Sequence, residues 1–279
     1  MKIAKRLFVL LLALLLCAGY AGAEAYVTVS ELRRQVADGW DKCEVIIPAV
    51  DKVPVLTLQA DSQAEDNPLM LTVGTFDESK SGKFVKSARY GKTPSHAALT
   101  NGLTLENAQA ILNDELKRLV GKGIDDYGLI WTEIAEWKNM ETWLLYYGQR
   151  FFGLTSFGHN TSLTIDVRTQ DYHHLIIPHY EAKEIIYEDV PLAAWPVIEE
   201  AVEKYLSSHK SGTPESLELG YLVRENGSEE MLVPVWHLGL TTPDGFKDVN
   251  FSAQTGEEVQ WTGKEYLFPE VFSWEAAQK

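Results

Sequence analysis

The C-terminal part of the chain alternates short apolar runs with turn residues, and this pattern predicts β-hairpins. Residues 221–225 and 231–236 are rich in apolar and β-branched side chains, and Asn226 and Gly227 stand between them. An Asn-Gly pair readily takes the two positive φ angles of a type I′ turn, whose twist matches that of the flanking strands. The two runs are therefore expected to pair as antiparallel strands.

A second hairpin is expected directly downstream. Residues 249–253 lead into Thr255 and Gly256, and residues 257–261 lead away from them. A glycine suits the point at which the backbone reverses, because it has no Cβ to restrict φ. Together the two hairpins predict an antiparallel meander at the end of the chain.

Helical periodicity marks a segment that begins at Thr104. Thr104 suits an N-cap, Glu106 lies in the first turn, and Gly121 stands just beyond the last turn, each where the caps and the helix dipole favour that residue type. One face of this helix carries the apolar residues Leu105, Ala108, Ile111, Leu112, Leu116 and Leu119. Strand-like runs follow at residues 127–137, 143–152, 162–168 and 172–177.

A second long helix is expected near Pro191 and Pro196, because prolines are tolerated only near the start of a helix. Its buried stripe consists of Ile198, Ala201, Val202, Tyr205 and Leu206. A short helix is predicted after Thr28, which fits a capping box with Glu31.

Each long helix is followed by several short strands, so the sequence predicts an α+β fold with two helix-plus-antiparallel-meander units. The expected segments are a signal peptide over 1–23, an N-terminal helix and strand-rich segment over 24–102, and the two units over 103–187 and 188–279. Within the strand-rich segment, residues 69–76 and 84–90 are expected to pair as a hairpin. The shared order of elements favours duplication of one ancestral unit.

The first residues have the features of a secretory signal peptide. Lys2, Lys5 and Arg6 give a positive start, residues 7–16 form an apolar run too short to span a bilayer, and residues 21–23 are small. The sequence therefore predicts export of the protein to the extracellular space or the cell envelope.

Lipid anchoring at Cys17 is the alternative to simple cleavage. A leucine at position 16 stands where lipoprotein signals normally carry a small residue, so simple cleavage is favoured. No second apolar run is long enough to anchor the mature chain, and no transmembrane segment is expected there. Cys43 would then be the one cysteine left, so no internal disulfide is expected.

The charge balance bears on possible partners. The chain has 25 Lys and Arg residues against 40 Asp and Glu, a formal net charge of −15, and removal of the three basic residues of the signal lowers it to −18. Nucleic acids and anionic membranes repel such a surface, because phosphate binding needs clustered cations. Nucleic acid is therefore excluded as an expected partner, while the oligomeric state stays open.

Metal-capable side chains are close together in sequence at His173, His174, His179, Glu181 and Glu184. In an extended strand His173 and His179 share a face while His174 takes the other. A zinc site needs at least three convergent ligands, and the sequence has no HExxH helix. The favoured interpretation is a polar strand rim, so no metal and no cofactor are expected.

Aromatic side chains are unusually dense between residues 131 and 152. Trp131, Trp137, Trp143 and Tyr147 are the candidates for a binding face. One face of these strands must pack on the helix after Thr104, and the other is either covered by protein or open to peptide or sugar rings. Coverage is favoured, because a protein without disulfides needs a large buried core.

A family resemblance rests on the order of helix and meander and on two strand-like segments. Residues 232–236 read Leu-Val-Pro-Val-Trp, and residues 252–257 read Ser-Ala-Gln-Thr-Gly-Glu. The arrangement over residues 104–265 resembles PepSY-like (cystatin-like) extracytoplasmic domains and YycI-type regulators. It is similar to a family of uncharacterised secreted or lipoprotein-like proteins of Gram-positive bacteria. The resemblance implies contact with protein or peptide, and it transfers no catalytic residues.

The sequence therefore predicts a secreted, non-catalytic binding or regulatory protein of the bacterial cell envelope. Its expected partner is a protein or peptide, bound through an exposed sheet edge or the aromatic face. The alternatives are a metal-dependent hydrolase that uses the cluster from His173 to Glu184, and a glycan-binding protein that uses exposed aromatic side chains.

Overall fold

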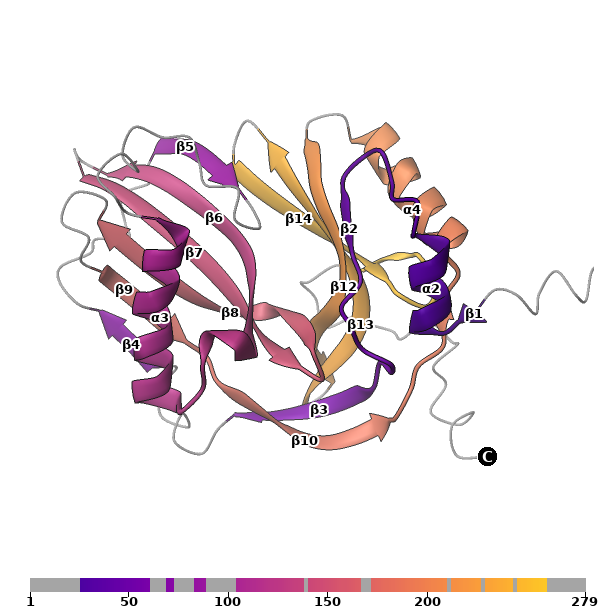
Figure 1. The fold of residues 1–279 in the computed structure, drawn as a ribbon, viewed down its shortest axis with the longest axis horizontal. Coiled ribbons are helices and arrows are strands. Elements are labelled where there is room, and N and C mark those ends of the chain that lie inside the picture. The colour runs from indigo at the N-terminus through magenta and orange to yellow at the C-terminus, as the bar shows by residue number, and fades with distance from the viewer. Residues whose placement is uncertain are drawn as a thin grey trace, which may run out of the picture.

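A computed structural model describes residues 26–60, 69–72, 83–88, 104–137, 140–166, 172–209, 212–226, 229–242 and 245–259. The expected signal peptide over residues 1–23, with Cys17, lies outside these residues. The described part is mostly β-structure, with a 13-stranded mixed sheet, a separate 2-stranded sheet and three α-helices (Figure 1).

The helices are α2 (Val29–Gln35), α3 (Leu105–Val120) and α4 (Trp195–Ser208), with a short 3-10 helix η2 (Ile124–Asp126). The strands up to α3 and its meander are β1 (Tyr26–Val27), β2 (Glu44–Ile46), β3 (Val55–Ala60), β4 (Leu69–Thr72), β5 (Lys83–Ala88), β6 (Tyr127–Trp137), β7 (Met140–Phe151), β8 (Leu154–Asp166) and β9 (Tyr172–Ile177). The later strands are β10 (Tyr180–Tyr187), β11 (Leu192–Ala193), β12 (Thr213–Asn226), β13 (Glu229–Thr242), β14 (Gly245–Ser252) and β15 (Glu258–Val259).

The strand order of the large sheet mixes early and late parts of the chain. The main path is β10-β3-β13-β12-β8-β7-β6-β5, and β14 pairs with both β13 and β15. β9 pairs with β8 and with β4, and β2 pairs with β12. The short strands β1 and β11 form the 2-stranded sheet.

The antiparallel pairing of both expected C-terminal hairpins is confirmed. β12 and β13 are antiparallel, but Asn226, which was expected in a type I′ turn, pairs with Glu229 at the end of β12, and residues 227–228 lie outside the described residues. β14 and β15 are also antiparallel, and Gly256 in the turn between them has a φ of 73°.

The predicted fold class is wrong, because the strands do not form two separate helix-plus-meander units. β8 and β12 pair in parallel, through Tyr221 with Ser156 and Leu222 with Phe157, and this pairing joins the two expected units into one sheet. β3, from the expected N-terminal segment, is inserted between β13 and β10. An edge strand carries unpaired N–H and C=O groups, so distant segments can complete the sheet in ways that local periodicity does not reveal.

The expected hairpin between residues 69–76 and 84–90 is also wrong. β4 pairs with β9, and β5 pairs with β6, so these strands bind distant partners and not each other. Residues 77–82, between the two expected strands, lie outside the described residues.

The helices begin where the sequence predicts. Thr104 Oγ1 accepts a hydrogen bond from the Asn107 backbone N–H at 3.1 Å, and Gly121 closes α3 with a φ of 67°. Pro196 lies in the first turn of α4, which has no side-chain N-cap bond. Thr28 caps α2 by accepting from the Glu31 N–H at 3.2 Å.

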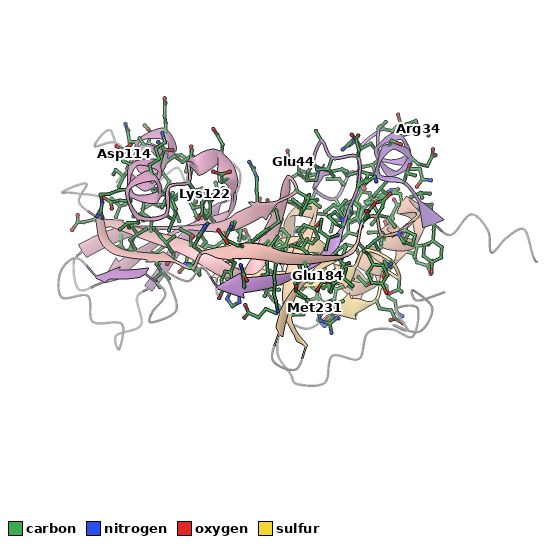
Figure 2. All side chains as sticks on the ribbon, turned by 90° about the horizontal axis from the view of Figure 1, so that it is seen from below. Arg34, Glu44, Asp114, Lys122, Glu184 and Met231 are labelled. Atoms are coloured by element: carbon green, nitrogen blue, oxygen red, sulfur yellow. The ribbon has the colours of Figure 1, made fainter. Side chains whose placement is uncertain are left out.

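The helices cover one face of the sheet. Figure 2 shows α3, with Asp114, and α2, with Arg34, on the same side of the strands, while Glu184 and Met231 lie toward the other side. Under α3 the buried cluster consists of Ala108, Leu112, Leu116, Tyr127, Leu129, Trp143, Leu145, Tyr147, Leu163, Ile165, Leu175 and Ile177. The larger cluster under α2 and α4 includes Leu32, Leu56, Trp195, Ile198, Val202, Tyr221 and Trp236.

Candidate functional site

The structure does not assemble the histidine and glutamate candidates into a metal site. His179 is buried, with its Nδ1 3.5 Å from the Tyr127 hydroxyl, whereas Glu181 and Glu184 are exposed on β10. His173 and His174 belong to β9, but their side chains lie outside the described residues. Among the side chains that the structure describes, no three His, Cys, Asp or Glu groups are placed to hold a metal ion.

Two of the aromatic candidates are buried in the core. Trp143 and Tyr147 are 0% and 1% exposed and lie in the cluster under α3, so neither can contribute to an exposed binding face. The side chain of Trp137 lies outside the described residues. These two side chains therefore lie on the face that was expected to pack on the helix after Thr104.

Trp131 has a different environment from Trp143 because its partners include a strand from the end of the chain. Its ring stacks on Tyr146 with centroids 3.9 Å apart, and on Phe246 of β14 with centroids 5.2 Å apart. The stack therefore links β6 and β7 with β14, and it leaves Trp131 half-buried.

A partly buried polar cluster lies where β8, β10 and β13 approach one another. His159 Nε2 and Glu230 Oε1 are 2.8 Å apart, and the His159 ring stacks on Tyr180 with a centroid separation of 4.5 Å. Burial, together with the negative charge of Glu230, raises the pKa of Tyr180 to about 12. Gln149 bonds both the backbone N–H and the C=O of Tyr180, so this cluster braces the start of β10.

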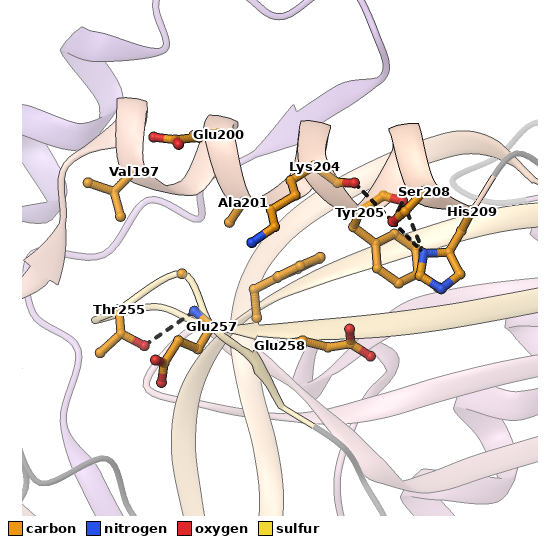
Figure 3. Close-up of a pocket in the computed structure, with 12 residues that line it drawn as sticks. Val197, Glu200, Ala201, Lys204, Tyr205, Ser208, His209, Thr255, Glu257 and Glu258 are labelled. Carbon is orange, nitrogen blue, oxygen red and sulfur yellow. Dashed lines mark hydrogen bonds between the residues drawn. The ribbon is translucent and has the colours of Figure 1, made fainter.

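The best candidate for a binding site is a groove of about 460 Å³ between α4 and the turn that joins β14 to β15. Its lining residues are Val197, Glu200, Ala201, Lys204, Tyr205, Ser208, His209, Phe251, Thr255, Gly256, Glu257 and Glu258 (Figure 3). Clefts of roughly 300–1,000 Å³ with a few convergent polar groups are typical of ligand sites. We call this site the α4 groove.

The spacing of residues on α4 positions one wall of the α4 groove. Val197, Ala201, Lys204 and Ser208 follow one another by three or four residues, so they lie along one helical face. The neighbouring stripe of α4, which includes Ile198 and Val202, is buried against the sheet. The helix is thus fixed by its inner stripe while the adjacent face stays accessible.

The turn after β14 forms the other wall, and Gly256 allows it to lie against α4. A Cβ added to Gly256 would lie 3.2 Å from the Val197 carbonyl oxygen and 3.3 Å from the Ala201 Cβ, and its φ is positive. The turn is held by a bond from the Gly256 N–H to the Ser252 carbonyl at 2.9 Å and by one from the Ser252 N–H to the Glu257 carbonyl at 2.8 Å.

Aromatic and apolar atoms form the floor of the α4 groove. Tyr205 and Phe251 are 6% and 2% exposed, and their rings meet edge to face with centroids 5.9 Å apart. The His209 ring stacks on Tyr205 at 4.2 Å. Such a floor favours the apolar parts of a ligand, while the charged side chains at the rim can fix its orientation.

The C-terminal turn of α4 orients His209 and Ser208. His209 Nδ1 lies 3.1 Å from the Tyr205 carbonyl oxygen, and because a carbonyl can only accept, Nδ1 is the donor in this bond. The Ser208 hydroxyl donates to the carbonyl oxygens of Lys204 and Tyr205, at 3.0 and 2.9 Å. This hydroxyl therefore satisfies the helix end, which is an arrangement for capping and not for nucleophilic attack.

The sequence pattern does not identify the α4 groove. It indicates packing for Ala201 and Tyr205 and a turn for Gly256, and it does not distinguish the charged rim residues Lys204 and Glu258 from other surface charges. The detectable signals were the glycine and the small residues of the helix face, but nothing in the sequence indicates that the turn packs on α4.

The remaining cysteine and the helix lengths also bear on expectations from the sequence. Cys43 is half-buried and packs against the cluster under α2 and α4. Within the described residues, no helix combines the length and apolar character needed to cross a membrane.

Comparison with known proteins gives no family. No protein-family model and no curated protein matches the chain. Similar solved structures include an uncharacterized protein from Eubacterium rectale, with 15% identity, a TM-score of 0.41, and coverage of 57% of this chain and 56% of that one. The YpeB C-terminal domain of Bacillus megaterium has 12% identity, a TM-score of 0.35, and coverage of 57% and 64%. The chain thus spans less than two thirds of either structure, and similarity at this level assigns neither fold nor function.

Proposed function

We propose that this protein is a secreted, non-catalytic binding or regulatory protein of the bacterial cell envelope, and that it holds a peptide segment in the α4 groove. The observation that carries the proposal is the groove itself, which has an aromatic floor and a rim of charged side chains. Peptides offer both apolar side chains for such a floor and polar groups for such a rim. The resemblance to PepSY-like and YycI-type domains is a hypothesis that agrees with this role.

Export is the second part of the proposal, and it rests on the signal-like residues 1–23. Mass spectrometry of protein purified from the culture supernatant and from the envelope fraction is expected to find a mature N-terminus at Glu24. A lipid-modified Cys17 at the N-terminus would replace simple cleavage with anchoring. An intact Met1 in cytoplasmic protein would contradict export.

The test of the groove uses two matched tryptophan substitutions. Val197 and Ile185 are both exposed apolar residues, at 38% and 46%, but only Val197 lines the α4 groove. Val197→Trp is expected to fill the groove without disturbing the core, and Ile185→Trp adds the same bulk on β10.

Peptides selected from a random heptapeptide display library on the wild-type protein serve as probes, and their affinity is measured by fluorescence anisotropy. Val197→Trp is expected to weaken binding at least tenfold, while Ile185→Trp changes it less than twofold, with unchanged circular dichroism for both. Equal binding by the wild type and Val197→Trp would overturn the groove as the site. Selection of no peptide, together with binding to a glycan array, would overturn the peptide proposal itself.

A further inference from the structure

We infer that the α4 groove recognises a dipolar peptide segment, one that carries a carboxylate and an ammonium or guanidinium group a few residues apart. This inference rests on the proposed function and adds the charge pattern of the ligand. It is carried by Lys204 on the helix wall and by Glu257 and Glu258 on the turn wall, which form no ion pair with one another.

The cationic groups belong to the helix wall. Lys204 and His209 lie at the C-terminal end of α4, and both are exposed. Figure 3 shows the Lys204 side chain extending from the helix into the space above the turn. The C-terminal end of a helix also favours positive charge, so this wall is the natural place for cations.

The anionic groups belong to the wall formed by the turn and β15. Glu257 and Glu258 are exposed and adjacent in sequence, and both line the groove. Figure 3 shows their carboxylates below Lys204, on the far side of the groove from the helix. Glu200, on α4, adds a third carboxylate at the rim.

These charges have no partners among the residues that the structure describes. Among the described residues, no ion pair or hydrogen bond involves the side chain of Lys204, Glu257 or Glu258. Exposed side chains of opposite charge that do not pair with each other remain available to a ligand that spans the gap. A ligand carboxylate would approach Lys204, and a ligand cation would approach the two glutamates.

The floor of the α4 groove can contact the part of the ligand that lies between its charged groups. Tyr205 and Phe251 line it with the 6% and 2% of their surface that stays exposed, and Lys247 Nζ lies 5.9 Å from the Tyr205 ring centroid. The methylene groups of an extended ligand can lie on this surface. The net formal charge of the lining is negative, with one lysine against three glutamates, so the lining as a whole attracts a ligand cation, whereas a ligand carboxylate is attracted by Lys204.

The inference is tested with three fluorescently labelled hexapeptides, blocked at both ends. The dipolar probe is Ala-Lys-Ala-Ala-Glu-Ala, and glutamine replaces either its glutamate or its lysine in the other two probes. On the wild-type protein at low salt, the dipolar probe is expected to bind about threefold to fivefold more tightly than either probe with a single charge, which is the range for exposed ion pairs. Added salt should reduce this preference.

Charge reversals then identify the two walls. Lys204→Glu is expected to abolish the preference for the dipolar probe over the lysine-only probe, and Glu258→Lys is expected to abolish its preference over the glutamate-only probe. Lys122→Glu and Glu184→Lys make the same changes in net charge at exposed positions outside the groove, and both are expected to keep the preferences.

The outcomes separate the two proposals. If all three probes bind equally and Val197→Trp abolishes their binding, the dipolar inference fails while the groove remains the peptide site. If the control reversals change the preferences as much as the groove reversals, the overall charge of the protein accounts for them, and the inference is overturned. If none of the probes binds while the library-selected peptides do, the inference fails as well.

Discussion

Helices α3 and α4 cover the same face of the sheet, but they differ in what their outer surfaces meet. α3 has a Thr104 cap and a Gly121 terminus, and its buried positions Ala108, Leu112 and Leu116 are fully covered. α4 has no side-chain N-cap bond, and the turn around Gly256 packs against its outer face. The helix with the clearer sequence signals is thus a cover for the core, and the less regular helix borders the candidate site.

The difference shows that helix caps and apolar helix faces indicate how a helix is stabilised. The candidate site, in contrast, forms where a second segment packs against the accessible face of a helix. Removing the core beneath α3 should therefore affect folding alone, and changes at the turn beside α4 should affect folding and binding together.

The largest effect is expected beneath α3. Trp143 is fully buried, so Trp143→Ala should destabilise the protein by about 3–5 kcal/mol through the cavity that it leaves. The indole N–H of Trp143 has no hydrogen-bond partner among the described residues, so Trp143→Phe should cost far less. Urea denaturation measures both, and peptide affinity of the folded fraction should be unchanged. Loss of affinity in Trp143→Phe would show that the two regions are coupled.

An intermediate effect is expected at the two glycines that follow α3 and β14. Gly121 and Gly256 both have positive φ, but a Cβ at Gly121 would meet nothing within 4 Å, whereas one at Gly256 would meet Val197 and Ala201. Gly121→Ala should therefore cost about 1 kcal/mol, and Gly256→Ala about 2 kcal/mol because backbone strain and crowding add. Only Gly256→Ala should also weaken peptide binding. Equal costs for the two variants would mean that the contact between the turn and α4 is loose.

The smallest effect is expected at the helix starts. Thr104→Ala should remove about 1 kcal/mol of stability, because the Asn107 N–H loses its acceptor. Ala194 is the N-cap of α4 and provides no such bond, so Ala194→Asp should add up to about 1 kcal/mol. Thermal denaturation of the two variants compares the helices directly. A destabilising Ala194→Asp would show that the start of α4 is fixed by its packing and not by its cap.

Local structure was predictable wherever neighbouring residues determine it. The limits of α3 follow from Thr104 and Gly121, and the second hairpin follows from Gly256, because caps and turns depend on only a few residues. The strand β6 was placed at residues 127–137, which matches its observed limits. Helix caps, turns and strand limits of this kind can therefore be predicted from a few neighbouring residues.

Partners at a distance could not be predicted. No feature of Leu56 or Leu58 indicates that β3 lies between β13 and β10, since any apolar strand fits that place. The α4 groove has the same origin, because Lys204 and Glu258 become neighbours only after α4 and the turn pack together. The aromatic candidates differ in environment for a related reason: Trp143 and Trp131 look alike in sequence, and only packing distinguishes them.

The place of β3 between β10 and β13 also limits when the sheet can be completed. Leu58 pairs with Glu230 on one side and with Ala182 on the other, so both neighbours of β3 are synthesised long after it. Pairings between distant residues form slowly, because a long loop must close first. A chain that emerges from its N-terminus therefore cannot finish its sheet until the last strands arrive. On the proposed export route, this delay would keep the chain unfolded while it passes through an export channel.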